Sequence, residues 1–157
     1  MNKKLIAYFS ATGTTAAAAK LLSETMEAEI YEIKPEVPYE KADLNWLNPL
    51  SRSSREMNGR NARPAIVMED IDISGYGTVY LGFPIWWYIA PTIVNTFLES
   101  QDFSGKKIIL FATSGGSGFG KAAAKLQPSC PGAVIEEGQV FKGKPSKEDI
   151  ENWVKTL

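Results

Sequence analysis

The sequence contains no histidine and only one cysteine, Cys130, and these two shortages exclude several kinds of site. Without histidine there is no Ser-His-Asp triad, and a lone cysteine offers no zinc cluster. One cysteine also cannot form a disulfide within the chain, so a reducing compartment is the default. No apolar run is long enough to span a bilayer. These shortages predict a cytoplasmic protein that does not insert into a membrane.

The chain also has little net charge, because 17 basic side chains are balanced by 18 acidic ones, giving a formal charge of −1. Such a chain has no global field to attract nucleic acid. Its four arginines, however, all lie in one short stretch, with Glu56 as the only acid among them: Arg52, Arg55, Arg60 and Arg63. Charge runs usually mark solvated surface, and contact with an anionic substrate is the alternative.

A length of 157 residues is typical of one domain, and we expect a single domain over residues 1–157. Short, uniformly apolar runs indicate strands that are buried on both faces, as in a parallel sheet covered by helices. The five expected strands lie at residues 5–9, 29–33, 79–83, 108–113 and 133–141. Helical patterns between and after them lie at residues 15–27, 91–99, 118–126 and 146–157. This alternation predicts an α/β fold with helices on both faces of a parallel sheet.

One segment, residues 34–74, does not fit the alternation. It is long, irregular and rich in proline, and it allows short helices near residues 44–47 and 51–57. The sequence shows no internal repeat and no domain boundary.

A loop suited to phosphate follows the first expected strand and leads directly into the first helix. It consists of Ser10, Ala11, Thr12, Gly13, Thr14 and Thr15. A helix start offers unpaired backbone N–H groups and a partial positive charge, and the four hydroxyl groups add side-chain donors. The glycine-rich patterns of P-loop nucleotide triphosphatases and of dinucleotide-binding folds are absent here. The loop therefore indicates an anion site of another type.

The pattern of Ser10, Thr12, Gly13 and Thr15 resembles the phosphate loop of the flavodoxin family, Thr/Ser-x-Thr-Gly-x-Thr. The resemblance extends over essentially the whole chain. It implies a three-layer, doubly wound fold with a five-stranded parallel sheet of order 2-1-3-4-5. It also implies that flavin mononucleotide (FMN) is the cofactor and sits at the carboxyl ends of the strands.

Two further loops lie at the carboxyl ends of expected central strands, where that resemblance implies the flavin ring. The third strand is followed by Pro84, Ile85, Trp86, Trp87 and Tyr88. The fourth is followed by a glycine-rich loop that includes Ser114, Gly115, Gly116 and Gly118. We expect an aromatic side chain of the first loop to stack on the ring and backbone amides of the second to meet its pyrimidine edge. Packing beneath the next helix is the alternative for each tryptophan, and the sequence does not decide which one stacks.

The expected function is electron transfer through bound FMN, with a redox partner protein. Residues 84–88 contain no glycine, although typical flavodoxins have one that lets a peptide flip when the flavin takes up one electron. This departure and the near-neutral charge allow an alternative, a two-electron reductase of the NAD(P)H:quinone type with a small electron acceptor. A non-redox binding module is the third possibility. No catalytic side chain and no metal ligand are expected, because the cofactor carries the chemistry.

Overall fold

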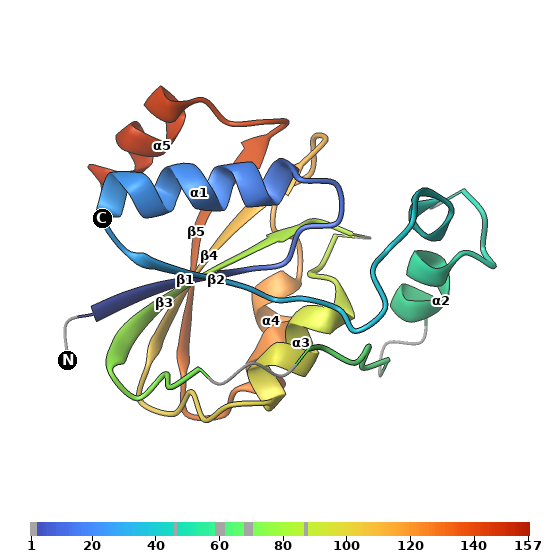
Figure 1. The fold of residues 1–157 in the computed structure, drawn as a ribbon, viewed down its shortest axis with the longest axis horizontal. Coiled ribbons are helices and arrows are strands. Elements are labelled where there is room, and N and C mark those ends of the chain that lie inside the picture. The colour runs from blue at the N-terminus through green and yellow to red at the C-terminus, as the bar shows by residue number, and fades with distance from the viewer. Residues whose placement is uncertain (1–2, 46, 59–61, 68–70, 87) are drawn as a thin grey trace.

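The structure is a computed structural model, and it describes residues 3–45, 47–58, 62–67, 71–86 and 88–157. Its centre is one parallel sheet with the strand order β2-β1-β3-β4-β5 (Figure 1). The strands are β1 (Lys3–Tyr8), β2 (Glu29–Glu32), β3 (Tyr76–Pro84), β4 (Lys107–Ser114) and β5 (Val134–Lys142). The sequence-based expectation of five parallel strands in the order 2-1-3-4-5 is thus confirmed.

Helices cover both faces of this sheet and complete the three expected layers. Helices α1 (Thr14–Met26) and α5 (Lys147–Val154) lie on one face, and α3 (Thr92–Glu99) and α4 (Ala122–Leu126) lie on the other (Figure 1). A short 3-10 helix, η2 (Gln127–Ser129), follows α4. Strand-helix-strand units of this kind put the carboxyl ends of all five strands at one edge, where the loops gather.

The hydrophobic core is split by the sheet, since successive strand residues point to opposite faces. In β1, Leu5 and Ala7 are buried with the α3 and α4 side, whereas Ile6 is buried with the α1 and α5 side. Trp153 of α5 packs in the second cluster against Phe111, with ring centroids 6.1 Å apart. The uniformly apolar strands of the sequence are therefore strands with two covered faces.

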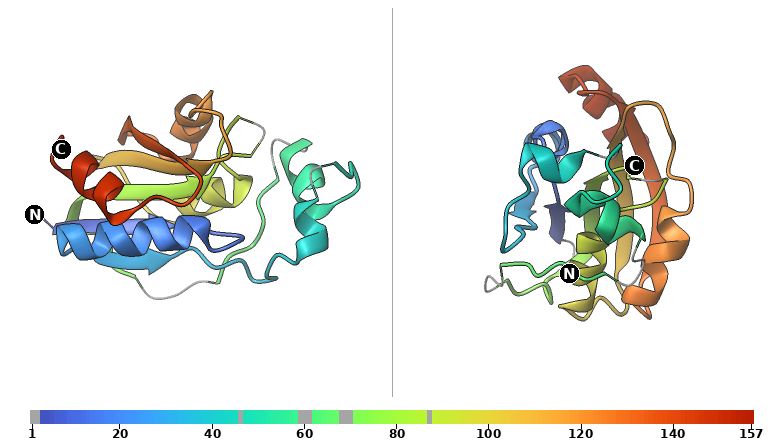
Figure 2. Two further views of the ribbon diagram at one scale, coloured as in Figure 1. Left: turned by 90° about the horizontal axis from the view of Figure 1, so that it is seen from above. Right: turned by 90° about the vertical axis from the view of Figure 1, so that its right-hand side faces the viewer.

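Between β2 and β3 the chain leaves the layers, and we call residues 33–75 the excursion. It carries a 3-10 helix, η1 (Lys41–Leu44), and a helix, α2 (Arg52–Asn58), which project beyond the carboxyl ends of the strands (Figure 2). The expected helix at residues 51–57 matches α2. The expected helix near residues 44–47 includes residue 46, which lies outside the described residues; the helix described beside it, η1, starts earlier at a capping box formed by Glu40 and Asp43 and ends at Leu44.

The start of α4 differs from the sequence-based expectation, and the start of α5 agrees with it. Helix α4 begins at Ala122 and not at residue 118, because Gly120 adopts a left-handed conformation (φ +56°) that an α-helix cannot include. Ser146 caps α5 as expected, and its hydroxyl accepts a hydrogen bond from the Asp149 N–H at 3.1 Å. The carboxylate of Asp149 accepts in return from the Ser146 N–H at 3.0 Å.

Candidate functional site

The loop between β1 and α1 leaves backbone donors unpaired, as an anion site requires. Gly13 is the N-cap of α1 and has a left-handed backbone (φ +96°), and its N–H donates to the Ser10 hydroxyl at 3.0 Å. Among the described residues no side chain caps the helix, and none accepts from the N–H groups of Thr14, Thr15 or Ala16. These three N–H groups are therefore available to an anion at the positive end of the helix dipole.

The hydroxyl groups of this loop have different surroundings. The Ser10 hydroxyl accepts from Gly13 and so shapes the loop, while Thr12 is exposed and Thr14 half-buried. Thr15 is buried, and its hydroxyl lies 2.7 Å from the hydroxyl of Thr113 at the end of β4. This contact joins the phosphate-type loop to the strand that carries the glycine-rich loop. Ala11 contributes a half-buried methyl group packed against the core.

The loop after β3 is a tight turn. Pro84 ends the strand, and Ile85 donates its N–H to the Thr113 carbonyl at 3.0 Å. Trp86 and Ile89 then exchange two backbone hydrogen bonds, of 2.9 and 3.0 Å. Tyr88 sits in the turn with φ +64°, an unusual conformation for a residue other than glycine. The turn holds the Tyr88 side chain 70% exposed.

The aromatic side chains of this loop therefore have different roles. Trp86 is half-buried and packs edge-on against Phe9 (centroids 5.8 Å apart) and Tyr39 (5.6 Å). Tyr88 has no such ring partner among the described residues and offers an open face. Trp87, the other candidate, lies outside the described residues.

The glycine-rich loop after β4 folds around one serine. The Ser114 hydroxyl accepts from the N–H groups of Ser117 (2.8 Å) and Gly116 (3.1 Å). The N–H groups of Gly115 and Gly118 have no acceptor in the part of the chain that the structure describes. Of the amides expected to meet a ligand, those of Gly115 and Gly118 are thus available, and that of Gly116 is already used within the loop.

The two loops meet at the base of a cleft of about 610 Å³. Ile85, Trp86 and Tyr88 line one part of it, and residues 114–117 line another. The loops also touch directly, since the Tyr88 carbonyl accepts from the Lys121 N–H at 3.2 Å. The volume falls within the range of about 300–1,000 Å³ that is usual for small-molecule sites.

The excursion supplies a third wall of this cleft, which the sequence did not reveal. Leu44 of η1 and Ser53 of α2 both line it. The sequence shows only that Ser51, Ser53 and Ser54 lie close together in a short helix. In so short a helix, no sequence pattern indicates that these serines are buried or that one of them lines a cleft.

A cluster of polar and aromatic side chains holds the excursion in place. The Tyr39 hydroxyl donates to the Glu56 carboxylate, and the Arg52 guanidinium lies 3.8 Å above the Tyr39 ring. Arg52 also pairs with Glu56 at 3.0 Å and donates to the Val37 carbonyl at 2.6 Å. Burial, followed by the hydrogen bond to Glu56, raises the pKa of the Tyr39 phenol well above its ordinary value. We call Tyr39, Arg52 and Glu56 the latch.

The arginine-rich stretch is therefore not one uniform solvated face. Arg52 belongs to the latch, and Arg63 pairs with Glu99 of α3 at 3.0 Å. That pairing keeps the pKa of the Glu99 carboxyl below its usual value. Arg55 is exposed, and Arg60 lies outside the described residues. Two of the four arginines thus tie the excursion together or to α3.

We expect Arg52→Ala to destabilise the protein by about 1–3 kcal/mol, because it removes an ion pair, a cation–π contact and a hydrogen bond at a poorly exposed site. Arg55→Ala, which changes an exposed arginine in the same helix, is the control and should change stability by no more than about 0.5 kcal/mol. Urea unfolding of the apoprotein measures both. Equal effects of the two substitutions would show that the latch does not hold the excursion.

None of the described helices is both long enough and apolar enough to cross a membrane.

Comparisons with known proteins identify relatives of this chain. The sequence profile described as flavodoxin matches residues 3–157. No curated protein matches the sequence at a significant level. Among solved structures, a candidate flavoprotein from Bacteroides uniformis ATCC 8492 is 48% identical, with a TM-score of 0.92 and 98% of each chain covered. One from Bacteroides eggerthii DSM 20697 is 43% identical, with a TM-score of 0.90 over 100% of this chain and 98% of the other.

A more distant structure shares the fold. The flavoprotein of Lactobacillus acidophilus NCFM, crystallised in complex with FMN, is 21% identical with a TM-score of 0.69, covering 98% of this chain and 99% of that one. The profile match spans nearly all of the sequence, and two structures above 40% identity cover almost the full length of both chains. The chain belongs to the flavodoxin family.

Proposed function

We propose that this protein binds FMN non-covalently and transfers electrons through it. The observation that carries the proposal is the convergence of an anion-type helix start and an aromatic, amide-lined cleft at one edge of the sheet. The distant Lactobacillus relative crystallised with FMN supports the same choice of ligand.

The residues present fit this cofactor. The unpaired N–H groups of Thr14, Thr15 and Ala16 would bind the phosphate, helped by the Thr12 and Thr14 hydroxyls. The exposed Tyr88 ring offers a stacking face, and the free amides of Gly115 and Gly118 offer donors to ring oxygens. FMN, when bound, supplies the redox chemistry, and the protein binds and orients it.

The first test is binding of FMN to the apoprotein, followed by quenching of flavin fluorescence. Riboflavin, which lacks the phosphate, is the matched ligand control. Because hydrogen bonds to a charged group contribute about 1.5–3 kcal/mol each, we expect FMN to bind about a hundredfold or more tightly than riboflavin. Equal affinities for the two ligands would show that the loop before α1 does not bind the phosphate. If neither ligand binds, the proposed function is wrong.

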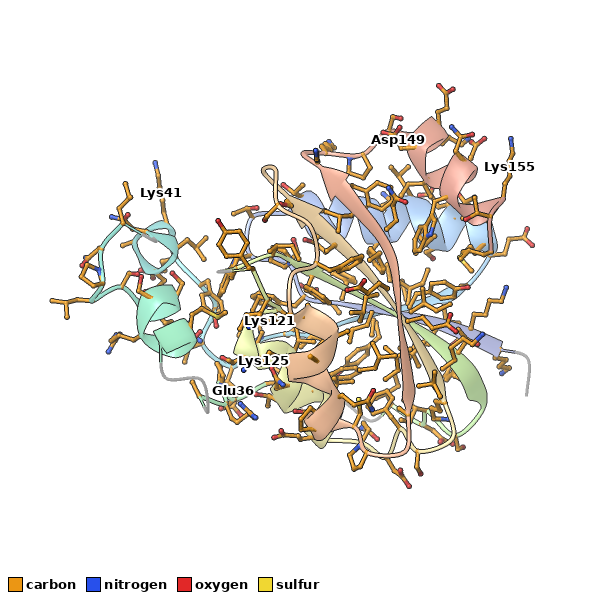
Figure 3. All side chains as sticks on the ribbon, turned by 180° about the vertical axis from the view of Figure 1, so that it is seen from behind. Glu36, Lys41, Lys121, Lys125, Asp149 and Lys155 are labelled. Carbon is orange, nitrogen blue, oxygen red and sulfur yellow. The ribbon has the colours of Figure 1, made fainter. Side chains whose placement is uncertain are left out.

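A second candidate function, a two-electron reductase that uses NAD(P)H and a small acceptor, rests on the excursion. Leu44 and Ser53 build a wall that makes the cleft concave, as small-molecule sites are. Two lysines belong to elements next to the cleft, since Lys121 is the N-cap of α4 after the glycine-rich loop and Lys41 lies on η1, although the Lys41 side chain points away from the molecule (Figure 3). A partner protein, by contrast, needs no walled cleft to reach the flavin.

An anaerobic reductive titration of the FMN-loaded protein, followed through the visible spectrum, separates the two candidates. A persistent long-wavelength band of one-electron-reduced flavin would favour the carrier. Direct bleaching to the fully reduced flavin, with oxidation of NAD(P)H on addition of a quinone, would favour the reductase.

A further inference from the structure

The hydroxyl of Ser53 is buried without a good hydrogen-bond partner. Ser53 is 2% exposed and lines the cleft from α2. The nearest hydrogen-bonding group in the described structure is the Ser51 hydroxyl at 3.5 Å, which is beyond the usual 2.5–3.0 Å of an O–H···O bond.

The two neighbouring serines, Ser51 and Ser54, share a hydrogen bond with each other. The Ser51 hydroxyl donates to that of Ser54 at 3.0 Å, a usual distance for an O–H···O bond. Ser54 is also 2% exposed but does not line the cleft. Ser53 is therefore the member of this serine group that lines the cleft, and its hydroxyl lacks a hydrogen bond of usual length.

Buried hydroxyl groups almost always have a partner, because leaving one unpaired carries a desolvation cost. No described backbone carbonyl accepts from Ser53, and because the residue lines the cleft, a better-placed partner can reach it from there. The cleft also contains Trp86 and Tyr88 and the glycine-rich loop, but not the first turn of α1. The group that reaches Ser53 is consequently the flat ring of a ligand and not its phosphate.

We propose that Ser53 donates a hydrogen bond to an acceptor atom on the edge of the FMN ring, so that the excursion is a fourth binding segment of the site. This inference rests on the proposed function. A flavin ring carries carbonyl oxygens and unprotonated nitrogens along its polar edge, and a hydroxyl donor suits either. Leu44, on the same wall, provides an apolar neighbour for the ring.

The latch gives Ser53 a defined position. Arg52, the residue before it, is held by Glu56 and the Val37 carbonyl, and Tyr39 packs on Trp86 of the cleft at 5.6 Å. Helix α2 is thereby joined to the loop that presents Tyr88. A hydroxyl held in this way binds with little further ordering, which is the advantage of a preorganised site.

The test compares Ser53→Ala with Ser54→Ala in the full chain. We expect Ser53→Ala to raise the FMN Kd about fivefold to tenfold, the loss expected for one hydrogen bond, and to shift the visible flavin absorption band. Ser54→Ala, which removes an equally buried hydroxyl outside the cleft, should leave the FMN Kd within about twofold and the band unshifted. Far-ultraviolet circular dichroism of the apoproteins checks folding. If Ser53→Ala fails to fold, Ser53→Cys, with its weak donor, should give an intermediate Kd.

The other outcomes are equally definite. An unchanged Kd and spectrum for Ser53→Ala would show that water satisfies the hydroxyl, and the proposal would fail. A change confined to the KM of an electron acceptor would assign Ser53 to that acceptor and also overturn the proposal. If the unmodified chain itself does not retain FMN, the proposed function fails together with this inference, which distinguishes the two cases.

Discussion

We expect Thr14→Asp to weaken FMN binding about a hundredfold or more while slightly stabilising the apoprotein. Thr14 is the first residue of α1, beside the unpaired N–H groups that would bind the phosphate. A carboxylate there repels the phosphate, and like charges placed together cost several kcal/mol. The same carboxylate interacts favourably with the positive end of the helix dipole, by about 0.3–1 kcal/mol.

The opposite signs of these two effects make the prediction specific. Thr14→Asn, which has the same shape as aspartate without its charge, is the control and should retain most of the FMN affinity. Fluorescence titration gives the affinity, and urea unfolding of the apoprotein gives the stability. If Thr14→Asp keeps its full FMN affinity, the phosphate binds elsewhere. If Thr14→Asp instead lowers the stability of the apoprotein, the substitution distorts the loop, and a weaker FMN affinity could not then be assigned to charge.

The second large effect is expected for Gly120→Ala. Gly120 has φ +56°, and a Cβ atom there would lie 2.3 Å from the Tyr88 carbonyl oxygen. The left-handed backbone costs about 1–2 kcal/mol for alanine, and the close contact adds a similar amount because a backbone atom cannot rotate away. We expect a total loss of about 2–4 kcal/mol in apoprotein stability. FMN affinity should fall at least tenfold, since Tyr88 must move.

Gly118→Ala is the control within the same loop. No heavy atom of the described residues lies within 4 Å of the position that a Cβ atom would take at Gly118, and the φ of this glycine is not left-handed. Apoprotein stability should therefore change by less than about 1 kcal/mol. Thermal unfolding of the two apoproteins is the measurement. If both glycines tolerate alanine equally, the contact between the two loops does not matter for the fold.

Much of the fold could be predicted because it depends on local patterns. Uniformly apolar runs of five or six residues indicated the central strands, and the strand-loop-helix sequence around Gly13 located the first loop. The capping residues Ser146 and Asp149 marked the start of α5 correctly. Where glycines interrupt such a pattern, as before α4, local propensity gave the wrong boundary.

The candidate site was predicted only in part. Its three loops follow from the carboxyl ends of strands in a parallel sheet, and two of them do line one cleft. The packing of Trp86 against Phe9 and Tyr39 depends on residues far away in the sequence, and so does the use of the Gly116 amide by Ser114 within a folded turn. Binding of FMN, the redox partners, the cytoplasmic location and the single domain stay predictions.

The sequence by itself determined the α/β class, the strand order through family resemblance, and the loop at the start of α1, since all of these depend on residue patterns along the chain. Tertiary structure alone decided that the excursion lines the cleft, that the latch of Tyr39, Arg52 and Glu56 holds it there, and that Ser53 is buried at the cleft. The physical reason is that burial and hydrogen-bond partners are set by contacts between segments distant in sequence. A short polar helix carries no periodic signal that says which of its hydroxyl groups those contacts will enclose.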